Sequence, residues 1–174
     1  MAKGRSTRTR KQTPDAEELL IEGLREIYSA ENQLVRALPR FERAVETQAL
    51  KEVMNTRSQQ AERLIQDLDE AFEEMDETPG RRKNVAAEGL ISDAREHVQE
   101  IEGGPALDSV LIASLQKTEH YCIAAWGTAR SMAKALGQKK VVDAMERALK
   151  EGRELDDRLT QLAEEEVTPA LMPA

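Results

Sequence analysis

Two glutamates occupy positions where the helical pattern of the chain calls for apolar residues. Glu31 interrupts an apolar series within residues 20–45, and Glu119 interrupts another within residues 111–136. Residues spaced three and four apart share one face of a helix, so both carboxylates should point into the core. A buried, ionised carboxylate is costly unless a metal, another cation or a proton compensates it. The first question about this chain is which of the three it uses.

The inward series of the next helical segment contains a cation, Arg57. A guanidinium can bond carboxylates from two sides, so Arg57 could neutralise Glu31 and Glu119 together. The alternative is a metal site, in which carboxylate-held iron with open positions would react with oxygen or peroxide. The candidate ligands for such a site are Glu31 and Glu119, assisted by Glu62, Glu151, Glu154 and the Cys122 thiolate.

The hydrophobic periodicity predicts five helices and no strand. They cover residues 14–46, a segment that Thr47 caps and Thr78–Gly80 ends, and then residues 83–101, 105–136 and 138–165. Short linkers near residues 47 and 137 predict two antiparallel hairpins, joined by a long crossover that carries the short third helix. Two hairpins with one long crossover are ferritin-like topology. We therefore predict an all-α, ferritin-like four-helix bundle with one extra short helix in the crossover.

The charge distribution separates the ends of the chain from its body. We predict a disordered basic tail over residues 1–13, a helical domain over residues 14–166 and a flexible C-terminus over residues 167–174. The tail holds five of the 25 basic residues and no acid, which leaves 20 basic against 33 acidic residues in the body. An acidic body argues against general nucleic-acid binding by the folded part. Contact with nucleic acid, or with the acidic surface of another subunit, remains open for the tail.

The sequence also favours a compartment. Cys122 is the only cysteine, so no internal disulfide can form. No stretch approaches the ~18 to 20 apolar residues of a membrane span, and no secretory signal is recognisable. We therefore expect a cytoplasmic protein with no membrane partner.

Three motifs resemble those of a known family. They are Tyr28–Glu31 followed by Gln33–Leu34, then Glu88–Ile91, and then Glu119–Tyr121 followed by Ile123–Ala124. Together with the helix order, they resemble the bacterial ferritin-like YciE/YciF family of small stress-associated proteins, over residues 18–163. The resemblance implies a four-helix core with an added short helix, a homodimer, and a site like those of di-iron carboxylate proteins. It implies no defined reaction.

The chain departs from the pattern of that family at the implied metal site. The resemblance implies a histidine and a glutamate three apart where this chain has Arg57 and Gln60, a glutamate in place of Cys122, and an acid in place of Gly152. A two-metal site needs about four to six inward ligands, so these losses favour Arg57 as the cation. One weakly held ion and a pair of irons stay open as alternatives.

Three further residues are candidates for supporting contacts. His120 should face the covering short helix, where Glu88 could fix the tautomer of its imidazole. Tyr28 could bring its phenol near the buried carboxylates. No catalytic residue is assigned. The sequence thus favours a stress-associated structural or binding protein with a partly degenerate metal site over an iron protein with oxygen or peroxide chemistry.

Overall fold

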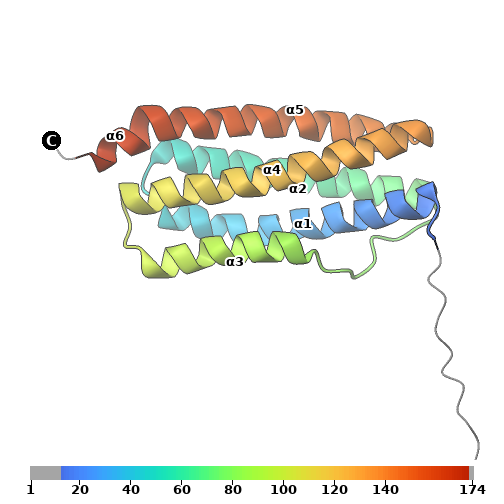
Figure 1. The fold of residues 1–174 in the computed structure, drawn as a ribbon, viewed down its shortest axis with the longest axis horizontal. Helices are drawn as coiled ribbons and strands as arrows, with labels where there is room; N and C mark the ends of the chain where they lie inside the picture. The colour runs from blue at the N-terminus through green and yellow to red at the C-terminus, as the bar shows by residue number, and fades with distance from the viewer. Residues whose placement is uncertain (1–12, 173–174) are drawn as a thin grey trace, which may run out of the picture.

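The computed structural model describes residues 13–172 and is almost entirely helical (Figure 1). Its elements are α1 (Ala16–Ala44), α2 (Gln48–Glu74), α3 (Val85–Glu100), α4 (Pro105–Ala135), α5 (Lys139–Leu162), the π-helical turn η1 (Ala163–Val167) and α6 (Thr168–Leu171). No strand occurs within these residues, so the predicted all-α class is confirmed. The same residues include no helix with an apolar run long enough to cross a lipid bilayer.

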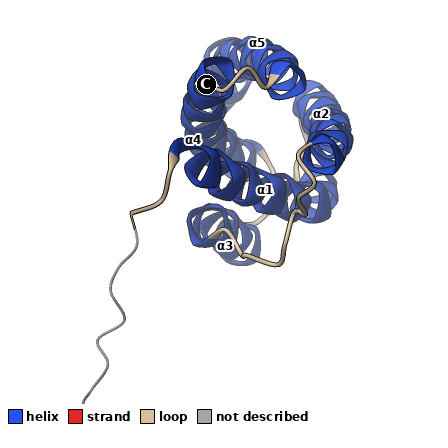
Figure 2. Cartoon of the chain, turned by 90° about the vertical axis from the view of Figure 1, so that its right-hand side faces the viewer, coloured by secondary structure: helices blue, strands red, loops and turns tan. Residues whose placement is uncertain are grey.

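The four long helices pack side by side around one core, and α3 lies outside them against α1 and α4 (Figure 2). Helices α1 and α2 form one hairpin, and α4 and α5 form the other, as the short linkers predicted. The segment between α2 and α4 crosses from one hairpin to the other and contains α3. Each long helix thereby turns one apolar stripe towards the same core.

Helix α1 begins at Ala16, two residues later than expected from Thr13 as the N-cap and Pro14 in the first turn, because Asp15 is the residue that caps it. The Asp15 carboxylate accepts a hydrogen bond from the Glu18 backbone N–H at 2.9 Å, and the Glu18 carboxylate accepts one from the Asp15 N–H at 3.1 Å. This reciprocal arrangement satisfies two amides that the first turn would otherwise leave unpaired.

The turn before helix α2 is held by a residue of another helix. Thr47 makes no capping bond with its own side chain. Instead, the carboxylate of Asp108 in α4, which is fully buried, accepts hydrogen bonds from the backbone N–H groups of Glu46 at 3.0 Å and Thr47 at 2.8 Å. We call Asp108 and these two amides the end clamp. The end clamp ties the turn of the first hairpin to the start of the second, and so helps to set their relative height.

The C-terminal end is more regular than expected. The fifth helix ends at Leu162, and the chain then continues through η1, where Val167 is buried, into α6. The predicted flexible segment from residue 167 therefore begins inside helical structure, while residues 173–174 lie outside the described residues. Nearly all of the predicted basic tail, residues 1–12, also lies outside them.

Candidate functional site

Three charged side chains meet in the middle of the bundle. The Nε of Arg57 donates to Glu119 Oε2 at 2.7 Å, while Nη1 and Nη2 donate to the two oxygens of Glu31 at 2.9 and 3.2 Å. The contact with Glu31 is bidentate, which fixes the plane of the guanidinium. We call Glu31, Arg57 and Glu119 the buried triad. The structure thus brings together the three residues whose positions on the apolar stripes predicted that they point inward.

The buried triad is sealed from water. The exposed fractions are 0% for Glu31 and 2% each for Arg57 and Glu119, which come from α1, α2 and α4. Burial alone would lower the pKa of Arg57, but the negative charges of Glu119 and Glu31 outweigh it and hold that pKa well above its ordinary value. Arg57 is therefore a permanent cation that links three helices.

Glu119 is the less satisfied of the two acids. Its Oε1 is buried and has no hydrogen-bond partner within residues 13–172. Burial raises the pKa of Glu119; the charge and hydrogen bond of Arg57 oppose that rise only in part, and the neighbouring charge of Glu31 adds to it. With two carboxylates around one guanidinium, the proton becomes the second means of neutralising the site.

Helix α5 contributes space to the site instead of a ligand. A Cβ atom added to Gly152 would lie 2.6 Å from Glu119 Oε1 and 2.7 Å from Cζ3 of Trp126. The Trp126 ring in turn covers Arg57, whose Cζ lies 5.4 Å from the ring centroid, within cation–π range. The loss of an acid at position 152 was visible in the sequence, but not that its place is filled by these two neighbours.

Cys122 completes the wall of the site as a neutral thiol. Its Sγ lies 3.7 Å from Nη2 of Arg57. Burial, together with the charge of Glu31, raises the pKa of Cys122 well above its ordinary value. In this arrangement the neutral thiol acts as a packing partner of Arg57, and its role as a thiolate ligand stays a prediction.

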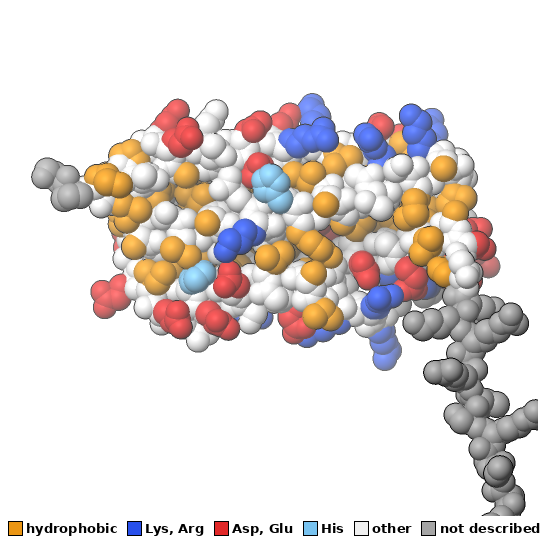
Figure 3. Space-filling view, in the orientation of Figure 1, with side chains coloured by type: hydrophobic (Ala, Val, Ile, Leu, Met, Phe, Trp, Pro, Cys, Tyr) orange, Lys and Arg blue, Asp and Glu red, His pale blue; other side chains and the backbone are white. Residues whose placement is uncertain are grey.

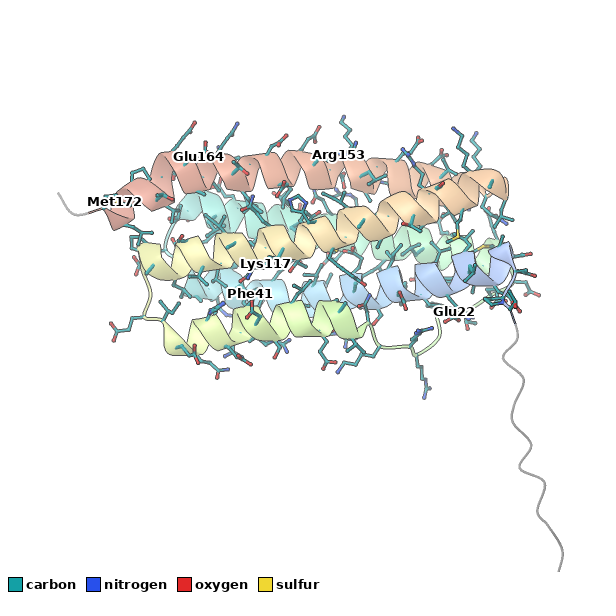
Figure 4. The ribbon with its side chains drawn as sticks, viewed as in Figure 1. Glu22, Phe41, Lys117, Arg153, Glu164 and Met172 are labelled. Carbon is teal, nitrogen blue, oxygen red and sulfur yellow. The ribbon has the colours of Figure 1, made fainter. Side chains whose placement is uncertain are left out.

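The other predicted ligands lie at the surface. Glu62 and Glu154 are exposed, and Glu151 pairs with Arg63 at 2.9 Å across the outside of α2 and α5. In Figure 4, side chains of α5 near the labelled Arg153 point away from the other helices. The expectation that these acids assist at the buried carboxylates is corrected. Each is adjacent in sequence to an inward position, and one residue along a helix turns the side chain by about 100°.

The predicted supporting contacts are also corrected. The His120 side chain is 67% exposed and lies against Asp156 of α5, with Nε2 and Oδ2 3.2 Å apart. Glu88 pairs with Lys83 instead of with His120. The Tyr28 ring packs edge-on against Phe72, with the ring centroids 6.2 Å apart, and the hydrogen bonds of the buried triad do not involve its phenol. Burial, with the nearby Asp69, raises the pKa of Tyr28.

The chain is similar to known proteins over most of its length. A family model described as a domain of unknown function, DUF892, matches residues 15–172. The chain belongs to the DUF892 family. A relative in sequence, Protein YciF of Escherichia coli (strain K12), is 36% identical over 148 residues, which are 84% of this chain and 89% of YciF. The predicted resemblance to the YciE/YciF group is thereby confirmed.

Two solved structures resemble this DUF892 chain closely. The crystal structure of the E. coli stress protein YciF gives a TM-score of 0.82 at 36% identity and covers 87% of this chain and 96% of YciF. YcfI from Rhodopseudomonas palustris, described as "a putative structural protein", gives a TM-score of 0.79 at 30% identity and covers 88% of this chain and 96% of YcfI.

The residues of this DUF892 chain do not fit a pair of metal ions. Within residues 13–172, no group of three or more His, Cys, Asp or Glu side chains comes together in a way that could hold one. The guanidinium of Arg57 fills the space between the only two buried mid-bundle carboxylates of that range, and its charge would repel a metal cation there. The site as built is an ion-pair network.

Proposed function

We propose that this DUF892 protein is a stress-associated structural or binding protein of ferritin-like fold, in which Arg57 takes the place of metal at the middle of the bundle. The observation that carries the proposal is the set of three hydrogen bonds from Arg57 to Glu31 and Glu119. The two hairpins with one long crossover support the ferritin-like assignment. The descriptions of YciF as a stress protein and of YcfI as "a putative structural protein" support the same proposal.

The chemistry of the buried triad supports a static role. A guanidinium neither changes oxidation state nor leaves the site, so Arg57 joins α1, α2 and α4 permanently. Breaking a buried ion pair strands an uncompensated charge, and such networks therefore favour one packing arrangement over alternatives. We infer that the triad fixes the relative height of three helices, the role that a bridging metal would otherwise fill.

The proposal is tested by restoring the implied ligands. The double variant Arg57→His/Gln60→Glu supplies the histidine and glutamate that the family resemblance implies, and it should bind Co²⁺ with visible absorption bands. The full-length native chain and the control Gln60→Glu should show none. Iron measured in freshly purified native protein should stay far below one ion per chain. About two irons per native chain would overturn the proposal.

A single weakly held ion is the second candidate, and it would make an iron protein with oxygen or peroxide chemistry. The buried Oε1 of Glu119, which has no partner within residues 13–172, favours it. Ligands that bind only the folded state stabilise it, so a chelator would then lower the melting temperature. Under the main proposal, excess EDTA leaves the melting temperature unchanged.

We also propose that the protein acts in the cytoplasm as a homodimer. The one cysteine, Cys122, is buried and unpaired, which suits a reducing compartment. Light scattering coupled to size-exclusion chromatography would check the oligomeric state, with a mass of twice 19.5 kDa expected.

A further inference from the structure

Charged residues form a regular ladder along the outside of the α2–α5 seam. Each rung of the ladder is an ion pair between a cation on one helix and an acid on the other. Because the two helices are antiparallel, later residues of α2 pair with earlier residues of α5. The rungs are Arg63–Glu151 at 2.9 Å, Asp67–Arg147, and Lys140 with Glu74 at 2.8 Å and Glu70 at 3.4 Å. The ladder therefore gives the register of the two helices directly.

The ladder lacks a cation at its next rung. The neutral Gln60 lies three residues before Arg63 on α2, and Glu154 lies three residues after Glu151 on α5. The next rung would therefore pair Gln60 with Glu154. Within residues 13–172, the ion pair that Glu154 makes is with Lys150 of its own helix, at 3.9 Å, and Glu52 makes none. Two carboxylates near this rung are thus without a cation from across the seam.

The seam opens into a groove of about 320 Å³ at this same level. Its apolar lining comes from both helices and consists of Ala49, Val53 and Leu155, while its acidic lining consists of Glu52, Glu151 and Glu154. The volume is at the lower end of the range for small-molecule sites. Arg158 also lines the groove and limits the space open to a positive charge. Apolar surface beside Glu154 and Glu52, neither of which has a cation from across the seam, calls for a ligand that is both aliphatic and cationic.

We propose that this groove binds a linear aliphatic diamine or polyamine. One ammonium group supplies the missing cation at Glu154, the methylene chain covers Val53 and Leu155, and a second ammonium reaches Glu52. A hydrated divalent metal would gain nothing from the apolar residues, and an anion would be repelled by the acids. The groove is separate from the buried triad, so the proposal does not depend on the function proposed for Arg57.

Calorimetric titration of the full-length protein with spermidine at moderate salt tests the proposal. The native chain should show saturable binding, and Glu154→Gln should weaken it about tenfold, the effect of losing one charged hydrogen bond. The control Glu73→Gln, an exposed acid on α2 outside the groove, should change the affinity less than about twofold. Circular dichroism checks that each variant keeps its helices.

A second variant fills the missing rung. Gln60→Lys should place an ammonium beside Glu154, and it should weaken spermidine binding about tenfold or more while leaving the melting temperature equal or higher. Three results would overturn the proposal: no saturable binding by the native chain, equal weakening in Glu73→Gln and Glu154→Gln, or Mg²⁺ binding as tightly as spermidine. The second and third would indicate diffuse attraction to an acidic surface.

Discussion

Helix α4 carries two buried carboxylates that the protein neutralises in different ways. Asp108, at one end of the bundle, is fully buried, and both of its oxygens accept backbone N–H groups. Glu119, near the middle, is 2% exposed; one of its oxygens meets Arg57 and the other meets no donor within residues 13–172. The same chemical group is fully satisfied at one height of the helix and half satisfied at the other.

The difference follows from where free backbone donors exist. The amides of Glu46 and Thr47 lie in the turn between α1 and α2, where no carbonyl of their own helix accepts them, so a nearby carboxylate can do so. In the middle of long helices every amide already donates to a carbonyl, and a buried carboxylate must find a side chain, a metal or a proton. This contrast explains why the mid-bundle acids need Arg57 and Asp108 does not.

The charges at the surface form a third environment. In the space-filling view, acidic and basic side chains are scattered over the face shown, between patches of apolar atoms (Figure 3). Water already solvates such groups, so their ion pairs contribute little to stability.

The largest effect should come from Arg57→Met. Removing the guanidinium strands two buried carboxylates and should lower the free energy of unfolding by about 3 to 5 kcal/mol. Urea denaturation measures the loss. The control Arg63→Met removes a half-exposed guanidinium from its pair with Glu151 and should cost about 0 to 1 kcal/mol. Equal losses in the two variants would contradict the special position of Arg57.

At the end clamp, Asp108→Asn should cost about 1.5 to 3 kcal/mol. The amide can still accept one of the two backbone N–H groups, but its own NH₂ would face the other. Asp93→Asn, at a partly exposed acid that lies 3.5 Å from Lys117, is the matched control and should cost less than about 1 kcal/mol. A loss at Asp108 no greater than this would show that the end clamp is not needed.

Gly152→Ala tests the packing around Glu119 and should cost about 1 to 2 kcal/mol. The added methyl group would overlap Glu119 and the rigid Trp126 ring, and overpacking outweighs the gain in helix propensity. Gly23→Ala in α1, where nothing lies within 4 Å of the added Cβ, should instead stabilise by about 0.5 to 1 kcal/mol. Thermal unfolding of the two variants measures these effects. If both substitutions stabilised the protein, the close contact of position 152 with Glu119 and Trp126 would be refuted.

The smallest effect should come from Glu119→Gln, which is expected within about 1 kcal/mol of the native chain at neutral pH. The amide oxygen can still accept from Arg57, and the site loses its excess negative charge. This is the direct contrast with Asp108→Asn, because both changes replace a buried carboxylate by its amide. If both variants lost the same stability, the distinction between the two sites would be lost.

The stability difference between Glu119→Gln and the native chain should depend on pH, because the pKa of Glu119 is raised in the native chain. The folded protein holds this proton more tightly than the unfolded chain, so ionising Glu119 costs stability as the pH rises from about 4.5 through the folded pKa. The stability of Glu119→Gln relative to the native chain should therefore grow across that window and then level off. Urea titrations between about pH 4.5 and 8 would show it, and a difference that shrinks with pH would be inconsistent with a raised pKa.

The features that could be predicted from the sequence are those recorded by periodicity. An apolar stripe marks the buried face of a helix. The five main helices and the inward positions of Glu31, Arg57 and Glu119 could therefore be predicted. Their meeting also followed, because short linkers fix which helices are neighbours. The boundaries were less accurate, since caps such as Asp15 act over one or two residues.

The features that could not be predicted depend on contacts between distant residues. Asp108 bonds amides more than 60 residues away, and no local pattern records them. At Gly152, the absence of a side chain does not say which neighbours fill the space. For Glu154, adjacency to an inward residue suggested a role that the rotation of one helical step removes. For His120, the predicted partner on the short helix was Glu88, whereas its imidazole lies against Asp156 of α5.

The most direct test of Arg57 as the replacement for a metal is a crystal structure with anomalous data, from protein purified without chelator and exposed to Fe²⁺. The predicted result is guanidinium density between Glu31 and Glu119 with no anomalous peak beside them. An anomalous peak about 2.0 to 2.6 Å from oxygens of both carboxylates, with Arg57 turned away, would contradict it.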